Sequence, residues 1–501
     1  MDMEKNRIPE SVRTIHLIAI CGAGMGALAG MLKDLGYLVT GSDQGVYPPM
    51  SDFLEKKGIP VTKGFSSENL AHRPDLVVVG NAVVRDNPEA RTLADMGLYF
   101  CSMPQALNRF VAGNKKVLMT TGTHGKTTTA SILAWILYRA GLDPTFFIGG
   151  ILRDFNSNYR LGNGDFFVVE GDEYDTAFFD KGPKFLHYDP HTAILTGVEF
   201  DHADIYRDLI HVKSAFGRLL SRMRPESTLL AFDGDPDVQD LTENRPCTVL
   251  PYGRRTGSPW RLGRIRIEPP RTTFEVLKQG SVFGLFRTRL PGEHNLFNAL
   301  SAIAASDGLG IPVEAMRDAV SSFQGPRRRQ EVRGVAGGIT VMDDFAHHPT
   351  AVRETIRGIR PFCTGRLIAV FEPRTNTSMR RVFQEIYATV FDDADLVVIR
   401  KPSRLDKVPE GERFSSEQLV SDLNRRGKPA LHFDTTENII HSLKQTARSG
   451  DTVLIMSNGG FDNIHSRLLA ELNAPARGET VPGEANASQE KNQEGSPLSS
   501  E

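Results

Sequence analysis

The sequence has few of the features that mark cross-linked, zinc-binding or strongly charged proteins. Its 501 residues include four cysteines, which lie far apart without a C-x-x-C pair, and this argues against a disulfide framework and a zinc site. Lysine and arginine number 59 against 61 acidic residues, a formal net charge of −2. No overall field therefore draws the chain to nucleic acid or to an anionic membrane.

Long apolar runs are also missing. No stretch approaches the roughly 18 apolar residues of a membrane-spanning helix, and the start of the chain is charged and lacks the apolar core of a signal peptide. We expect a cytoplasmic protein that binds neither membranes nor nucleic acid. At about 150 residues per domain, the length favours about three domains.

A glycine turn between an apolar strand and a helix is the most informative motif. Residues 116–120 form the expected strand, and an apolar pattern with helical spacing begins at Ala130. The backbone N–H groups of such a turn and the helix dipole favour phosphate. Thr120 stands where the generic motif has its first glycine. The predicted nucleotide triphosphate site comprises Gly122, Thr123, His124, Gly125, Lys126, Thr127 and Thr128, with Lys126 on the outer phosphates and Mg²⁺ on the hydroxyl of Thr127.

A second glycine motif lies near the start of the chain. Residues 14–21 predict a buried strand that leads through a glycine turn into a helix, and Asp43 follows about 20 residues later, at the end of the next strand. Taken alone, this pattern favours NAD or NADP, although any nucleotide diphosphate could use the same cradle. The residues of this predicted cradle are Gly22, Ala23, Gly24, Met25, Gly26, Ser42, Asp43 and Asn81.

Acids and a histidine follow strands in the middle of the chain. Glu170 ends one predicted strand, and His202 follows the next one. Because the carboxyl ends of parallel strands meet at one edge of a sheet, these side chains predict an Mg²⁺ shell beside the phosphate loop. Glu173, Asp175 and Asp204 are weaker candidates, since solvated acids are common in loops.

Asn295 and Asn298 precede a helix predicted over residues 299–308. Their spacing of three residues would place both side chains on one face at the helix N-terminus, where they could contact a nucleotide. Capping of that helix is the alternative role for Asn295.

The last part of the chain alternates strands with helical stretches, which is typical of a mostly parallel sheet. Strands are predicted over residues 339–342, 367–371, 396–399 and 452–456. Polar residues again gather at the strand ends, after an arginine triplet at residues 327–329. The candidate ligands among them are Arg328, Asp344, Arg374, Asn376, Ser457 and Asn458.

These patterns predict an α/β protein of three domains. They are a Rossmann-like domain over residues 1–112, a central P-loop ATPase domain over 113–325 and a second Rossmann-like domain over 326–473. Residues 474–501 are polar, with almost no large apolar side chains, and are predicted to form a disordered tail.

In identity and order, the motifs resemble those of the Mur ligases, the ATP-dependent amide ligases of peptidoglycan synthesis. The resemblance covers roughly residues 14–470. A missing first glycine at Thr120 is usual in that family, and its first domain binds a UDP-sugar, so the resemblance replaces the NAD interpretation. The motifs that carry it are the two glycine turns, Glu170, His202, His294-Asn295-x-x-Asn298, the arginine triplet and Asp343-Asp344-x-x-His347-His348-Pro349.

Further segments resemble one branch of the family. Residues 42–50, 188–190, 199–204, 371–376 and 456–461 are similar to ligases that join the recycled tripeptide L-alanyl-γ-D-glutamyl-meso-diaminopimelate to UDP-N-acetylmuramate. The branch that adds L-alanine to the same UDP-sugar is the alternative. Other branches carry a carbamylated lysine near the second Mg²⁺, but Lys213 lies a helical turn too early to take that role.

The resemblance implies ATP, Mg²⁺ and an acyl-phosphate intermediate, in a monomer or weak homo-oligomer. It implies catalytic roles for Lys126, Glu170 and His202, and metal ligation by Thr127, Glu170 and His202. The implied nucleotide contacts beyond the phosphate loop are Asn295, Asn298, Arg328 and Asp344. The candidates for peptide binding are Arg374, Asn376, Ser457 and Asn458. Arginine suits bidentate recognition of a peptide carboxylate.

Two interpretations from other classes remain open. An NAD-dependent oxidoreductase would leave the second phosphate loop and the Mg²⁺ shell without a purpose. A non-catalytic ATP-dependent switch would not need three groups of polar strand ends. The sequence does not identify the base that takes the proton of the amine.

Overall fold

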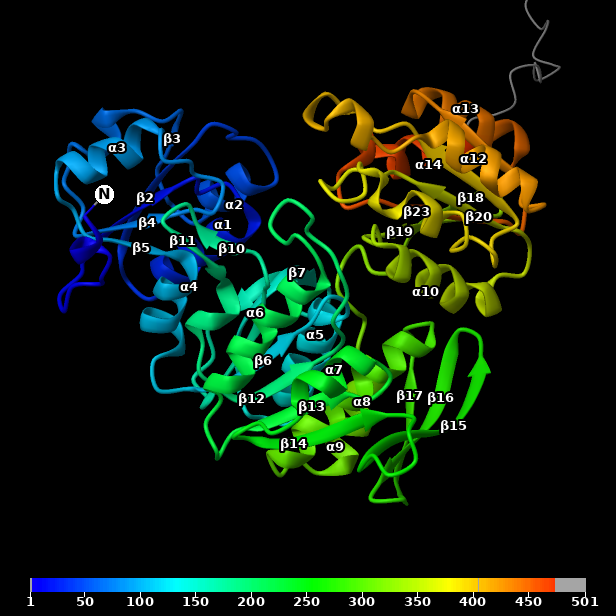
Figure 1. Cartoon of the computed structure of the whole chain (residues 1–501), viewed down its shortest axis with the longest axis horizontal. Coiled ribbons are helices and arrows are strands. Elements are labelled where there is room, and N and C mark those ends of the chain that lie inside the picture. The colour runs from blue at the N-terminus through cyan, green and yellow to red at the C-terminus, as the bar shows by residue number, and fades with distance from the viewer. Residues whose placement is uncertain (1, 404, 474–501) are drawn as a thin grey trace, which may run out of the picture.

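In the computed structural model, residues 2–403 and 405–473 are described, and they form three α/β domains. Figure 1 shows the N-terminal domain in blue and the C-terminal domain in yellow to red, above a central domain in cyan and green. Within these described ranges, no helix is both long and apolar enough to cross a membrane. The tail predicted over 474–501 lies outside the described residues.

The N-terminal domain is built on a parallel sheet with the strand order β3–β2–β1–β4–β5. The order reverses between β1 and β4, which is the place where such sheets bind ligands. Its strands are β1 (Thr14–Ile18), β2 (Leu38–Asp43), β3 (Val61–Lys63), β4 (Leu76–Val79) and β5 (Phe100–Ser102). Its helices are α1 (Ala23–Asp34), α2 (Met50–Lys56), α3 (Pro88–Asp95) and α4 (Met103–Ala106), and a π-helical turn follows at Leu107–Ala112.

The central domain contains a mixed sheet in the order β17–β16–β15–β14–β13–β12–β6–β9–β7–β8. Its strands are β6 (Lys116–Thr121), β7 (Thr145–Leu152), β8 (Ser157–Arg160), β9 (Phe166–Gly171), β12 (Pro190–Leu195), β13 (Thr228–Phe232), β14 (Thr248–Gly253), β15 (Trp260–Glu268), β16 (Arg271–Lys278) and β17 (Ser281–Thr288). A separate hairpin comprises β10 (Asp175–Ala177) and β11 (Asp180–Pro183). The helices are α5 (Lys126–Arg139), α6 (Leu209–Arg222), α7 (Pro236–Thr242), α8 (Glu293–Gly308) and α9 (Val313–Ser322).

The C-terminal domain has a sheet in the order β18–β19–β23–β20–β21–β22, parallel except for the edge strand β18. The predicted, mostly parallel sheet is therefore confirmed. Its strands are β18 (Glu331–Ala336), β19 (Ile339–Asp344), β20 (Leu367–Phe371), β21 (Leu396–Arg400), β22 (Ala430–Phe433) and β23 (Thr452–Met456). Its helices are α10 (Pro349–Ile359), α11 (Gln384–Tyr387), α12 (Ser416–Arg425), α13 (Thr436–Thr446) and α14 (Ile464–Asn473).

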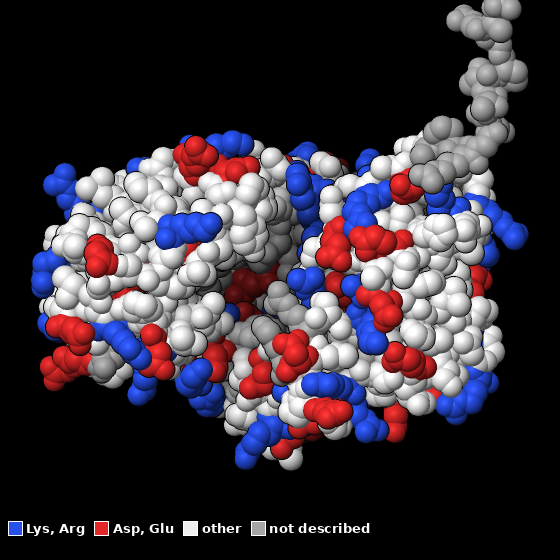
Figure 2. Space-filling view, turned by 90° about the horizontal axis from the view of Figure 1, so that it is seen from above, with Lys and Arg blue, Asp and Glu red and all other residues white. Residues whose placement is uncertain are grey.

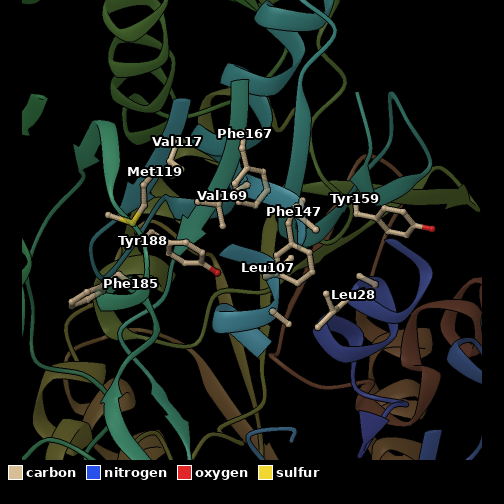
Figure 3. Packing of buried hydrophobic residues seen from close by; sticks show 14 of the residues in the cluster. Leu28, Leu107, Val117, Met119, Phe147, Tyr159, Phe167, Val169, Phe185 and Tyr188 are labelled. Carbon is tan, nitrogen blue, oxygen red and sulfur yellow. The ribbon is translucent and has the colours of Figure 1, made fainter. Parts of the chain in front are cut away.

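One hydrophobic cluster joins the N-terminal and central domains. Leu28 of α1 and Leu107 pack together with Phe147, Tyr159 and Val169 of the central sheet (Figure 3). The opposite face of the central sheet packs against α5 and α8 in a second cluster. The C-terminal domain has two clusters of its own, which use alternate residues of β20 and therefore lie on opposite faces of its sheet. The first two domains thus share a core, and the third domain has a separate one.

Leu28→Ala is expected to lower the free energy of unfolding by about 2–5 kcal/mol, because the truncated side chain leaves a cavity in this shared cluster. Leu28 is fully buried, whereas Leu38 is half exposed. Leu38→Ala is therefore the matched control and should change stability by less than about 0.5 kcal/mol. Urea denaturation followed by circular dichroism measures both, and equal stability of the two variants would contradict the role assigned to Leu28.

Candidate functional site

A cavity of about 2070 Å³ lies where the three domains meet. Figure 2 shows the molecule hollowed between its two sides, with acidic residues visible inside the hollow. Both glycine turns, the acidic loops of the central domain and the arginine triplet line the cavity. The structure therefore brings the main predicted motifs into one site.

The phosphate loop connects β6 to α5, as predicted. Gly125 is the N-cap residue of α5 and has a φ of +80°, a conformation that favours glycine. A Cβ at Gly125 would also lie 2.5 Å from Asn298 Oδ1. Gly125 therefore permits both the turn and the close approach of α8 to the loop.

Asn295 and Asn298 do share a face of α8, but the helix begins earlier than expected. It starts at Glu293 with Gly292 as its N-cap residue, so Asn295 lies in the first turn and does not cap the helix. The Asn295 amide donates to the carbonyl oxygen of Pro291 at 2.7 Å, and Asn298 Nδ2 donates to Asn295 Oδ1 at 3.2 Å. The first turn was missed because its polar residues face the cavity and interrupt the apolar pattern.

Lys126 and His202 meet at one buried carboxylate. Lys126 Nζ donates to Glu173 Oε2 at 2.8 Å and to the carbonyl oxygen of Gly122 at 2.7 Å. On its other side, Glu173 Oε1 lies 3.1 Å from His202 Nε2. The Glu173 side chain is 3% exposed. Glu173 was a weaker candidate in the sequence, and its position in a loop gave no sign that it would reach across to two neighbouring strand ends.

The carboxylates around Lys126 and His202, the two partners of Glu173, favour the positively charged forms of both side chains. Burial alone would lower the pKa of Lys126, but the charges of Glu173 and Asp172 raise it above its usual value. Burial likewise opposes the imidazolium of His202, yet the hydrogen bond to Glu173 and the charge of Asp201 raise its pKa. The surroundings of both side chains therefore favour their charged forms beside the phosphate loop.

Glu170 and Thr127 supply oxygen atoms on the other side of the loop. Thr127 Oγ1 donates to Glu170 Oε2 at 3.1 Å, and the Gly149 N–H donates to Glu170 Oε1 at 2.6 Å. Burial raises the pKa of Glu170. A hydroxyl and a carboxylate are ligands that Mg²⁺ prefers, so these two residues fit a magnesium site. His202 is held by Glu173 instead, and its metal ligation stays a prediction.

The other acidic candidates have separate roles. Asp175 forms an ion pair with Lys181, at 3.2 Å, within the β10–β11 hairpin. Asp204 accepts a hydrogen bond from Asn376 Nδ2 at 2.9 Å, which joins the central and C-terminal domains. Lys213 is held by Asp237 at 2.7 Å and Asp240 at 3.0 Å, so the structure gives it no part in the site.

Within the arginine triplet, two side chains point to different partners. Arg328 Nη2 donates to the carbonyl oxygens of Ser457 and Gly459, both at 2.7 Å, and thereby holds a turn of the C-terminal domain. Burial lowers the pKa of Arg329, although the charges of Asp344 and Glu170 act in the opposite direction. The Arg329 guanidinium lies over the ring of Phe345, 4.9 Å from its centroid, and Arg329 lines the cavity, so it is a further phosphate candidate beside Arg328.

Asp344 lies at the end of β19 and lines the cavity. Its carboxylate accepts hydrogen bonds from the N–H groups of Gln330 at 2.8 Å and Ala346 at 2.7 Å. Burial raises its pKa. Its predicted contact with the nucleotide is compatible with this placement.

The cradle of the N-terminal domain divides into lining and supporting residues. Asp43 accepts hydrogen bonds from the N–H groups of Cys21 at 2.8 Å and Gly45 at 2.9 Å, and so shapes the loop. Ser42 is buried, and its hydroxyl donates to Glu89 Oε2 at 2.7 Å. The residues that line the cavity are Gly22, Ala23, Gly24, Met25 and Asn81; Gly26 is buried behind them, beneath Met50.

The predicted peptide-binding residues surround the turn that Arg328 holds. Ser457 Oγ donates to Glu372 Oε2 at 2.5 Å, and Arg374 Nη1 lies 3.8 Å from Glu372 Oε1. A Cβ on Gly459 would lie 2.3 Å from Arg374 Nε, so a larger residue here would force the Arg374 side chain to move. Asn458 lines the cavity, and its buried Oδ1 has no hydrogen-bond partner among the described residues.

Models of three families match the chain in succession. They are described as Mur ligase family, catalytic domain (residues 14–115), Mur ligase middle domain (120–306) and Mur ligase, glutamate ligase domain (327–459). A relative from Escherichia coli, named UDP-N-acetylmuramate–L-alanyl-gamma-D-glutamyl-meso-2,6-diaminoheptandioate ligase, is 40% identical over 457 residues, which are 91% of this chain and 97% of the relative. The chain belongs to the Mur ligase family.

Further relatives include both branches that the sequence analysis considered. The crystal structure of a murein peptide ligase from Psychrobacter arcticus is 34% identical, with a TM-score of 0.69, and the match covers 93% of this chain and 100% of that one. A UDP-N-acetylmuramate–L-alanine ligase from Syntrophomonas wolfei is 34% identical over 464 residues, 91% of this chain and 97% of the relative. The predicted three-domain Mur ligase architecture is confirmed, while the domain boundaries at 112/113 and 325/326 stay predictions.

Glu173→Gln is expected to reduce ATP-dependent turnover of this Mur ligase by about 100-fold or more, the scale of removing one preorganised charged group. It should also lower the melting temperature, because Lys126 is left as a buried charge without its carboxylate. Added ATP should raise the melting temperature of this variant by more than it raises that of the wild type, since its phosphates can replace the lost charge. Thermal unfolding and phosphate release measure these effects.

Asp175→Asn is the matched control, because Asp175 pairs with Lys181 in the neighbouring hairpin. It should leave turnover within a few-fold of the wild type. Similar losses of turnover in the two variants would contradict the role assigned to the Glu173 carboxylate beside Lys126.

Proposed function

We propose that this Mur ligase joins the tripeptide L-alanyl-γ-D-glutamyl-meso-diaminopimelate to UDP-N-acetylmuramate, with hydrolysis of ATP to ADP and phosphate, in peptidoglycan recycling. The observation that carries the proposal is the match, along nearly the full length of both chains, to the E. coli ligase named for these substrates. A second ligase of that name, from Haemophilus influenzae, is 37% identical over 463 residues. Addition of L-alanine is the alternative activity, supported by relatives of 34% identity or less.

The proposed reaction has two bond-forming steps. The lactyl carboxylate of the muramoyl group attacks the γ-phosphorus of ATP, ADP leaves, and an acyl phosphate forms. The amine of the tripeptide then attacks the acyl carbon, phosphate leaves, and the amine loses a proton. In such phosphoryl transfers the protein contributes mainly position and charge neutralisation.

Lys126 and the loop N–H groups would bind the outer phosphates of ATP. One Mg²⁺ held by Thr127 and Glu170, and a second held by His202, would neutralise negative charge on the phosphates. Arg329 lines the cavity and interacts electrostatically with Glu170, and its charge would add to this neutralisation. Asn295, Asn298, Arg328 and Asp344 would position the nucleotide between the central and C-terminal domains.

The UDP part of the sugar substrate would occupy the cradle of the N-terminal domain. Gly22, Gly24 and Asn81 line the cavity there, at the strand-order reversal where such sheets bind ligands. A nucleotide diphosphate placed here would direct its attached muramoyl group toward the phosphate loop, because the same cavity is continuous between the two sites.

The tripeptide would bind near the turn at Ser457–Gly459. It carries carboxylates far from its reacting amine, whereas L-alanine has one close to the amine. Glu372 holds Ser457 and lies beside Arg374, and Asn458 lines the cavity with its buried Oδ1 unpartnered among the described residues. These groups can hold a carboxylate and an ammonium group, which are both present at the diaminopimelate end.

Mass identification of the product tests the proposal directly. Enzyme, ATP, Mg²⁺ and UDP-N-acetylmuramate are mixed with either the tripeptide or L-alanine. We expect a UDP-N-acetylmuramoyl tripeptide, no alanine adduct, and no product from Lys126→Ala, which keeps the fold but loses the phosphate contact. An alanine adduct would replace the proposal by the L-alanine ligase, and ATP turnover without any adduct would support a switch.

Arg374→Ala is expected to raise KM for the tripeptide by about 10- to 100-fold, the effect of losing a charged hydrogen bond of about 1.5–3 kcal/mol. Gly459→Ala should have a similar effect, because its Cβ would displace the Arg374 side chain. KM for ATP should barely change in either variant. Steady-state kinetics with each substrate varied in turn measures both constants.

Arg381→Ala provides the control, because Arg381 is an exposed arginine shortly after the same loop. A normal tripeptide KM in Arg374→Ala, together with a lowered melting temperature, would instead identify Arg374 as a structural ion-pair partner of Glu372.

A further inference from the structure

A second group of metal-ligating side chains lies apart from Thr127, Glu170 and His202. It consists of His124 in the phosphate loop, Glu199 after β12 and His348 at the N-cap of α10. One ligand atom from each of these three residues lies within 4.8 Å of the others. Two domains therefore contribute to one small cluster at the edge of the cavity.

The separations of the ligand atoms suit a metal ion. His124 Nε2 lies 2.9 Å from Glu199 Oε2, and His348 Nδ1 lies 3.3 Å from the same oxygen. In a tetrahedral site with bonds of about 2.0–2.1 Å, neighbouring ligand atoms are about 3.3–3.4 Å apart. The two separations to Glu199 are therefore within about half an ångström of tetrahedral spacing, and the ligand nitrogens of His124 and His348 lie within 4.8 Å of each other.

Hydrogen bonds outside the cluster fix two of the three ligands. His348 Nε2 lies 3.2 Å from the carbonyl oxygen of Phe200. A carbonyl only accepts, so Nε2 carries the proton and the lone pair of Nδ1 is directed toward Glu199. The N–H of Thr350 also donates to Nδ1, at a long 3.3 Å. The contact with Phe200 is of the kind that sets the tautomer and the orientation of metal-binding histidines, whereas the Thr350 N–H shares the single lone pair of Nδ1 and would be displaced by an ion.

Thr350 also orients the carboxylate. Its hydroxyl donates to Glu199 Oε1 at 3.0 Å, which leaves Oε2 facing both imidazoles. Nδ1 of His348 and Oε2 of Glu199 are both acceptors and lie 3.3 Å apart, so a cation between them would offset their repulsion in exchange for the long hydrogen bond from the Thr350 N–H. His124 and Glu199 are 30% and 39% exposed, while His348 is 7% exposed, so an ion can reach the cluster from the cavity.

The donor set selects the kind of ion. Two imidazole nitrogens and one carboxylate suit Zn²⁺ and other divalent d-block ions, whereas Mg²⁺ prefers oxygen ligands alone. Three protein ligands also leave a fourth position for water or for a substrate oxygen.

We propose that His124, Glu199 and His348 form a binding site for a divalent d-block ion such as Zn²⁺, separate from the magnesium ligands. Because His348 belongs to the C-terminal domain and the other two ligands to the central domain, the bound ion ties these two domains together.

The test uses the full chain, stripped of metal with a chelator and then dialysed. ZnCl₂ is titrated by calorimetry, without nucleotide and with excess MgCl₂ present. We expect one ion per chain with a micromolar or lower Kd, and release of about one proton, because His124 must give up the proton on Nε2 to bind. CoCl₂ should give the intense visible absorption of a tetrahedral site.

Variants identify the ligands independently of ligase activity. His348→Gln and Glu199→Gln should abolish stoichiometric binding, and Thr350→Val should weaken it by about 10- to 100-fold through loss of an outer contact. His432→Gln, which changes an exposed histidine on β22, should bind as the wild type does. Thr350→Val keeps the side-chain shape, so it remains informative if a ligand variant fails to fold.

Absence of stoichiometric binding by the wild type would overturn the proposal, and so would unchanged binding in Thr350→Val together with either ligand variant. The cluster would then be a hydrogen-bonded contact between domains. Since the readout is metal binding, this result is distinct from failure of the proposed ligase reaction.

Discussion

Three adjacent parallel strands of the central sheet end at the same level, and the groups around the phosphate loop depend on this alignment. The register places Thr121 of β6 beside Gly171 of β9 and beside Leu195 of β12. The phosphate loop follows the middle strand, Glu173 follows β9 and His202 follows β12. A carboxylate from one outer strand can therefore contact a lysine and a histidine attached to the other two. The strand order, more than any single contact, sets the spacing of the charges.

The domains are joined by two different kinds of interface. The N-terminal and central domains share one apolar cluster, so their separation would expose buried hydrocarbon. The central and C-terminal domains meet through polar contacts, such as Thr350 to Glu199, Asn376 to Asp204 and the N–H of Ala203 to Thr377. Hydrogen bonds of this kind contribute about 1 kcal/mol each and exchange readily with water or ligand. These two interfaces favour a fixed arrangement of the N-terminal and central domains. They allow the position of the C-terminal domain to depend on what the cavity holds.

The sequence predicted the fold well, because strands and glycine turns are encoded locally. β20 and β23 have the predicted bounds, and Lys126, Glu170 and His202 line one cavity. It failed where the outcome depends on contacts across strands. Glu173 looked like a solvated loop acid, and the triplet did not show that Arg328 holds the Ser457 turn while Arg329 lies over Phe345. The polar first turn of α8 hid the start of that helix. The hydroxyl of Ser42 donates to Glu89, which is distant in sequence, and its predicted contact with a ligand stays a prediction.

The Glu173 carboxylate and an entering phosphate compete for Lys126 at the phosphate loop. A buried lysine without a partner is costly, and Glu173 supplies the negative charge that Lys126 needs when no phosphate is bound. An entering phosphate brings the same charge and competes with the carboxylate for the lysine. Because Glu173 also holds His202, weakening its bond to Lys126 changes the environment of the histidine at the same time. Nucleotide binding at Lys126 and the environment of His202 are therefore coupled through the Glu173 carboxylate.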